Sequence, residues 1–222
     1  MPSGSFNARA YSFFDTLLWI ACLNLLWIFF ALAGAGILGA GPATAAAHIA
    51  IRKRVRGSEA PLARSFASHY FSNFGRANAI ALPVMGVAVV LAMNWNYFSR
   101  SGDVISQLVA AGIFVVAIFL AGAACYLFPM YARYELPLAR YLLTSSRFAF
   151  RHLAGTVILL FISAAAFYAS STVPGLIPFF SVGAWLFVTG WLCDRFFSAN
   201  DESVATAEAA APDDAVPVAS VA

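Results

Sequence analysis

The chain has 222 residues, of which 62% are hydrophobic and only 10% are charged, and its formal net charge is +3. A soluble domain normally carries about 25% charged residues, so this composition excludes an ordinary water-soluble globular protein. The apolar residues gather in long uncharged runs, which is typical of membrane-spanning helices. The sequence therefore predicts an all-α integral membrane protein with about five transmembrane helices.

The first long run without a charged residue covers residues 17–51 and ends just before Arg52. It is too long for one span of about 20 residues and slightly short for two. We expect one span over residues 17–38, a bend at Gly39 to Pro42, and a short helix over residues 43–51. The sequence leaves open whether that short helix re-enters the membrane under a cover of protein. The length of the run, with Asp15 just before it, favours an uncleaved span over a signal peptide.

Four further spans are expected, and they cover residues 77–93, 105–129, 153–172 and 177–193. The last two are joined by a turn that contains Pro174 and Gly175, which predicts a tight hairpin. After Arg195 the sequence becomes rich in alanine and acidic residues, without aromatic residues or an apolar period. We therefore expect a membrane domain over residues 1–197 and a disordered acidic cytoplasmic tail over residues 198–222.

Basic residues predict the orientation in the membrane. With five spans, all of them except Arg9 and Arg100 fall on one side. This distribution predicts a multi-pass protein of a bacterial cytoplasmic (inner) membrane, with the amino terminus outside and the carboxyl terminus inside. If the first apolar run instead forms a hairpin, the amino terminus moves to the inside.

A six-residue word occurs twice in the basic loops, as EAPLAR at residues 59–64 and as ELPLAR at residues 135–140. Proline suits the first turn of a helix, and both following stretches are amphipathic at about 100° per residue. We expect two helices in the cytoplasmic interface. One has an apolar side with Phe66 and Tyr70, and the other has an apolar side with Leu138, Leu142, Ala149 and Leu153.

These two helices suggest an internal duplication, although two interface helices could also have converged on the same short word. Their basic side chains are the candidate contacts to anionic lipid head groups or to a partner protein. The candidates are Arg64, Arg76, Arg140, Arg147 and Arg151.

No motif for catalysis is found, and we expect no enzymatic activity, cofactor, metal site or nucleic-acid partner. No charged residue lies well inside a predicted span, which argues against an ion-coupled carrier. Asn24 is the one strongly polar residue deep in an apolar run. We expect it either to form a hydrogen bond with a neighbouring helix or to contact a substrate.

An ordered set of segments resembles the YesL-like family of bacterial membrane proteins, over about residues 11–197. The segments are Asn24-Leu25-Leu26-Trp27, Pro42-Ala43-Thr44 with the basic run after it, Phe128-Pro129 with Arg133-Tyr134, and Pro174-Gly175-Leu176-Ile177-Pro178-Phe179-Phe180. The function of this family is not established. Its members are often encoded near carbohydrate-uptake and polysaccharide-degradation systems, so the resemblance implies an accessory role in sugar uptake.

Two functions remain open on the sequence. The first is an accessory or regulatory component of carbohydrate uptake, which would contact subunits of a sugar importer or a membrane sensor through the basic helices. The alternative is a small solute permease that acts as a homo-oligomer. The alternative is motivated by proline-broken segments at Pro42, Pro129 and Pro174, since broken helices often build transport sites.

Overall fold

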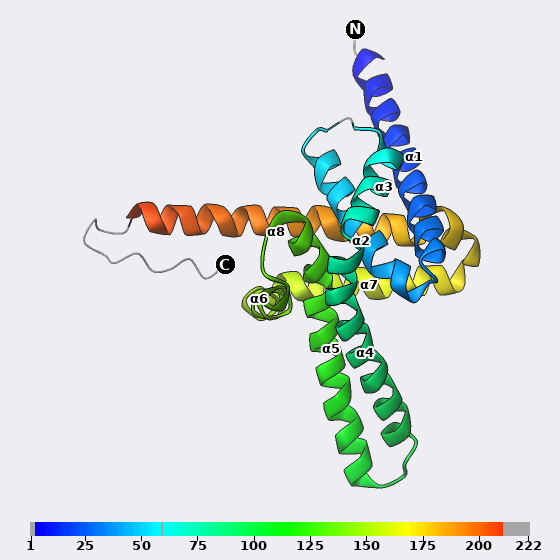
Figure 1. Cartoon of the computed structure of the whole chain (residues 1–222), viewed down its shortest axis with the longest axis vertical. Coiled ribbons are helices and arrows are strands. Elements are labelled where there is room, and N and C mark those ends of the chain that lie inside the picture. Colours follow the sequence, from blue (N-terminus) through cyan, green and yellow to red (C-terminus); the bar gives the residue numbers. More distant parts are fainter. Residues whose placement is uncertain (1–2, 59, 211–222) are drawn as a thin grey trace.

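The computed structural model describes residues 3–58 and 60–210, and over these residues it is helical throughout, without a strand (Figure 1). This confirms the predicted all-α class. The helices are α1 (Ser3–Ala33), α2 (Ile37–Val55), α3 (Leu62–Ser72), α4 (Phe74–Ser99), α5 (Val104–Arg133), α6 (Leu138–Arg151), α7 (Leu153–Thr172) and α8 (Val182–Ala210). A 3₁₀ turn, η1 (Pro174–Leu176), and a π-helical turn, η2 (Ile177–Ser181), lie between α7 and α8.

Five helical segments of the described chain are long and apolar enough to cross a membrane, and they include α1, α4, α5, α7 and α8. Their side chains leave large apolar surfaces uncovered; Phe13, Phe161 and Phe167, for example, are each more than half exposed. Such surfaces are stable in a bilayer and not in water. The chain is a membrane protein, as its composition predicts.

The first apolar run forms a helical hairpin, and this corrects the bend expected at Gly39 to Pro42. The chain reverses earlier, between α1 and α2, where Ala35 and Gly36 have φ values of 58° and 74°. Gly36 adopts this left-handed backbone at little cost because it has no Cβ. Pro42 lies inside α2 instead of ending a helix.

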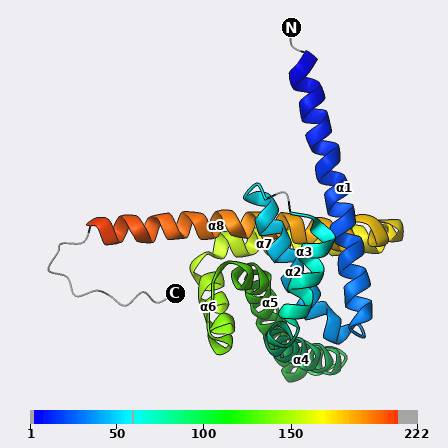
Figure 2. The same cartoon turned by 45° about the horizontal axis from the view of Figure 1, so that its top comes forward.

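The hairpin brings the first half of α1 beside the basic end of α2. Asp15 forms an ion pair with Arg54, whose guanidinium also lies over the ring of Trp19, 5.5 Å from its centroid. With five spans, the sequence predicts the amino terminus and this basic cluster on opposite sides of the membrane; with a hairpin in the first apolar run, it predicts them on the same side. The Asp15–Arg54 pair places the first half of α1 on the same side as the basic end of α2, and Figure 2 shows both helix segments toward the top of the view.

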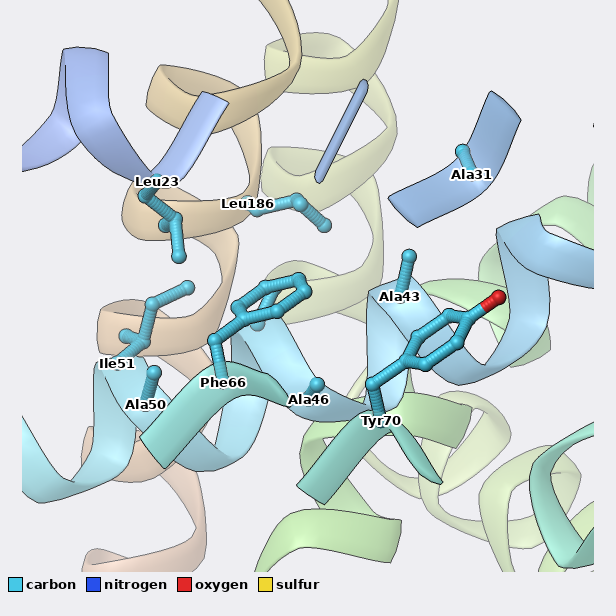
Figure 3. Close-up of a cluster of buried hydrophobic side chains, with 10 residues drawn as sticks. Leu23, Ala31, Ala43, Ala46, Ala50, Ile51, Phe66, Tyr70 and Leu186 are labelled. Carbon is cyan, nitrogen blue, oxygen red and sulfur yellow. The ribbon is translucent and has the colours of Figure 1, made fainter. Parts of the chain in front are cut away.

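Helix α2 is the central helix of the fold and contacts α1, α3, α4, α5 and α8. Its inner residues are small, and Ala43, Ala46 and Ala47 are fully buried. The small side chains let the rings of α3 approach closely, as Figure 3 shows for Phe66 and Tyr70. The Tyr70 hydroxyl donates a hydrogen bond of 3.0 Å to the carbonyl of Phe30 at the far end of α1.

The two interface helices begin directly after the prolines of the repeated word, α3 after Pro61 and α6 after Pro137. In α3, Phe66 and Tyr70 are buried, as the apolar pattern predicts. In α6 the buried residues are Tyr141, Ser145 and Ala149, so of the predicted apolar side Ala149 is buried and the three leucines are exposed. Leu142, which the repeat aligns with Phe66, is 40% exposed. The likeness therefore covers the helix starts and not the packed faces, and the duplication stays a prediction.

Helix α8 extends past the predicted fifth span and reaches Ala210, well into the stretch predicted to be a disordered tail. In Figure 1 its last turns extend away from the other helices. Because alanine has the highest helix propensity, the alanine-rich sequence after Ser198 favours continuation of the helix. The rest of the predicted tail, residues 211–222, lies outside the described residues.

Candidate functional site

Asn24 ties α1 to the irregular start of α8. Its side-chain nitrogen donates to the carbonyls of Ile177 and Pro178, at 3.1 and 2.7 Å. Its side-chain oxygen accepts from the backbone N–H of Gly183 at 2.8 Å. The π-helical turn leaves backbone groups without regular helical partners, and Asn24 satisfies them.

The two helices approach too closely at this point for any side chain on residue 183. A Cβ on Gly183 would lie 2.6 Å from the carbonyl oxygen of Ile20 and 2.8 Å from the Cβ of Asn24. Asn24 is fully buried, and both ends of its amide are occupied by backbone groups. Of the two expected roles, the structure shows the hydrogen bond to a neighbouring helix.

A charged junction, defined here as Arg52, Arg133, Asp194 and Asp201 with Tyr134, joins α2, α5 and α8. The Arg133 guanidinium donates to the Asp194 carboxylate at 2.8 Å and to the Asp201 carboxylate at 2.7 Å. Its side chain is only 10% exposed. Since water is largely excluded, the attraction between these charges is stronger than it would be at the surface.

Tyr134 and Arg52 complete the junction. The Tyr134 hydroxyl donates to Asp201 at 2.8 Å, and burial together with that carboxylate raises the pKa of Tyr134 to about 12, so the phenol stays protonated. The Arg52 guanidinium donates to the carbonyl of Ala132 at 2.7 Å. That carbonyl belongs to the last turn of α5, where a cation satisfies free carbonyls and complements the helix dipole.

A small cavity of about 10 Å³ lies inside the junction, between α2, α5 and α8. His48, Arg52 and Asp194 contribute to its lining. The Nδ1 of His48 and the Nε of Arg52 are buried without a protein partner among the described residues. A cavity of this size has room for about one water molecule and is too small for a sugar.

The five arginines predicted as contact residues lie elsewhere and do not form one cluster with the junction. Arg64 and Arg76 are exposed on α3 and at the start of α4, and Arg140, Arg147 and Arg151 are exposed on α6. On α6 the arginines follow one another at positions 140, 147 and 151, which is the spacing of one helix face. They point away from the buried face that contains Tyr141 and Ser145.

Sequence reasoning missed the junction, although some of its signals were visible. Arg52 and Arg133 were counted as loop charges for the orientation and not as partners of an acid. Asp194 directly follows the predicted fifth span. Asp201 belonged to a stretch expected to be unstructured. An acid just past an apolar run is a signal for such a pair, because charges near the membrane are usually paired.

The comparisons with known proteins identify the family of the chain. Residues 20–95, from α1 to α4, match the family described as "Protein of unknown function, DUF624". The chain is 33% identical to "Uncharacterized protein YesV" of Bacillus subtilis over 171 residues, which are 77% of this chain and 82% of that protein. The chain belongs to this family.

Two other proteins of Bacillus subtilis are also similar to this DUF624 member. "Uncharacterized protein YteU" is 28% identical over 78% of each chain. "Uncharacterized protein YesL" is 28% identical over 63% of this chain and 66% of its own. These matches confirm the YesL-like resemblance. No solved structure matches the chain significantly.

Proposed function

We propose that this DUF624 protein is an accessory component of carbohydrate uptake that acts by binding a partner protein at the membrane. The observation that supports it is the contrast between two sets of arginines. Arg52, Arg54 and Arg133 are used by the fold itself. Arg64 and Arg140, at the starts of the two interface helices, are exposed and available for contact.

The proposed partner is a subunit of a sugar importer or a membrane sensor, because the resemblance to the YesL-like family implies an association with sugar-uptake systems. Short helices between spans are suitable docking elements because they present side chains outside the bilayer on a rigid base. Both interface helices have such a base. Phe66 and Tyr70 fix α3 on α2, and Tyr141 fixes α6 to the end of α5, where its hydroxyl donates to the Tyr134 carbonyl at 2.6 Å.

Replacement of Arg64 and Arg140 together by alanine should abolish or strongly reduce capture of the partner and lower sugar uptake in cells, while the protein still inserts. The change removes two exposed charges and no packed group. The measurement is gentle solubilisation, affinity capture and mass spectrometry of the co-purified proteins, alongside uptake of labelled sugars.

The matched control is Arg100→Ala. Arg100 directly follows the last residue of α4, at the end of this helix that lies away from Arg76. It should leave both capture and uptake unchanged. If the double variant captures the same proteins in the same amounts and supports normal uptake, the proposed function is wrong.

We also infer that the basic end faces the cytoplasm of a bacterial inner membrane, with the start of α1 on that side. The positive-inside rule and the Asp15–Arg54 pair support this orientation. In a variant without the three native cysteines, Ser101→Cys, between α4 and α5, should react with an impermeant thiol reagent in intact cells. Ser5→Cys should react only after the membrane is opened. Labelling of Ser5→Cys in intact cells would contradict this orientation.

A further inference from the structure

A groove lies between the α4–α5 hairpin and the α6–α7 pair, remote from the charged junction. It encloses a cavity of about 320 Å³, lined by residues of α4, α5, α6 and α7. Val87, Phe119, Phe150, Leu153 and Val157 belong to this lining and are each more than 45% exposed. The groove is therefore open to the surroundings of the apolar helices.

The groove offers no free polar group to a ligand. Its two hydroxyl side chains both donate to backbone carbonyls, Ser146 to Leu142 and Thr156 to Ala149, each at 2.8 Å. A sugar would lose its hydrogen bonds with water in such a groove without replacing them. A hydrocarbon chain loses nothing there, so the lining favours an acyl chain.

Contacts of α5 with α6 and α7 fix the shape of the groove. A Cβ on Gly122 of α5 would lie 2.8 Å from the Cγ2 of Thr156, so the Thr156 side chain on α7 packs directly against the α5 backbone. About one turn earlier on α5, the ring of Phe119 stacks on the ring of Phe150 of α6, with centroids 4.8 Å apart. The lining on α7 runs from Leu153 to Leu160, which is a rise of about 10 Å along the helix.

Positive charge lies beside this apolar groove. On α6, Ser146, Ala149 and Phe150 line the groove. Arg147 directly follows Ser146 in the sequence, and Arg151 directly follows Phe150. Arginines 140, 147 and 151 are exposed, and no acidic residue occurs in α6. An anionic group at the end of an acyl chain would meet these guanidinium groups, which bind phosphate bidentately.

We propose that this groove is a binding site for an anionic phospholipid, with one acyl chain between α4, α5 and α7 and the head-group phosphate at Arg147 and Arg151. The inference does not depend on the proposed partner, because it uses neither Arg64 nor Arg140. In this proposal α6 binds anionic phospholipids selectively, in addition to lying at the membrane surface.

The test is native mass spectrometry of the purified full chain, titrated with phosphatidylglycerol or with phosphatidylcholine. The wild type should bind one phosphatidylglycerol more tightly than phosphatidylcholine. Arg147→Gln with Arg151→Gln should weaken phosphatidylglycerol binding by roughly 30-fold, from the contribution of two arginines near an anionic surface. Phosphatidylcholine binding should weaken much less, because its choline cation offsets the charge of its phosphate. The matched control, Arg56→Gln with Arg100→Gln, removes the same charge from exposed positions outside α6 and should change the binding of neither lipid.

A second pair of variants tests the acyl-chain groove. Val87→Trp should fill it and weaken both lipids, whereas Val89→Trp, two residues along α4 and outside the lining, should weaken neither. Both positions are exposed, so neither change disturbs the packed interior. Equal binding by the two tryptophan variants, or a head-group preference that survives loss of both arginines, would overturn the proposal.

Discussion

Replacement of Arg133 by glutamine should destabilise the protein by about 3–5 kcal/mol, the usual effect of removing one partner from a buried ion pair. The side chains of Arg133 and Asp194 are only 10% and 18% exposed. Without the guanidinium, the Asp194 carboxylate would remain in a poorly hydrated site without its cation. The measurement is reversible unfolding in mixed micelles, monitored by tryptophan fluorescence.

Two companion variants separate the buried pair from the exposed one. Asp201 is 44% exposed, so Asp201→Asn should cost less than about 1 kcal/mol, as surface pairs do. Adding Asp194→Asn to Arg133→Gln should recover part of the lost stability, because the uncompensated carboxylate is then gone. A loss for Arg133→Gln as small as that for Asp201→Asn would show that the junction does not hold the helices together.

The membrane class and the spans of this protein follow from composition, because contact with lipid requires long apolar helices whatever their partners are. The starts of α3 and α6 were also predictable. A proline fixes its own backbone and disfavours helix in the residue before it, so Pro61 and Pro137 mark both boundaries.

The full length of helix α2 and its position beside α1 could not be predicted from composition. Protein covers it on several sides, so its residues need to be small and not strongly apolar; Ala46 and Ala47 are fully buried although they contribute little hydropathy. A search for spans by hydropathy therefore leaves α2 out, and the sequence predicts only a short helix over residues 43–51 here. Its antiparallel placement beside α1 depends on the reversal at Ala35 and Gly36, which the glycines at 39 and 41 obscured.

The charged junction depends on contacts between distant parts of the chain. Arg133 is 61 residues from Asp194 and 68 from Asp201. Nothing in a single sequence states that these side chains meet, since the pairing results from how α5 and α8 cross. The prediction of a disordered tail also removed Asp201 from consideration, although the alanine content after Ser198 favours a helix.

Replacement of Asn24 by leucine should have the second large effect, a loss of about 3 kcal/mol. The two side chains have the same branched shape and the same number of heavy atoms, so the change removes hydrogen bonds without opening a cavity. It leaves the carbonyls of Ile177 and Pro178 and the N–H of Gly183 without this partner. Each buried polar group left unpaired costs about 1–3 kcal/mol, although transmembrane hydrogen bonds are often at the low end.

The control is Asn78→Leu, the same substitution at another buried asparagine. The side-chain oxygen of Asn78 has no partner among the described residues, so its loss should cost far less in the same micelle unfolding experiment. Hydrogen exchange distinguishes a local effect from a global one. In Asn24→Leu, the amides of residues 177–183 should exchange faster than those of α4, because the asparagine tethers only this irregular turn. Equal stability losses for the two variants, with no faster exchange at residues 177–183, would show that Asn24 is not the tether between α1 and α8.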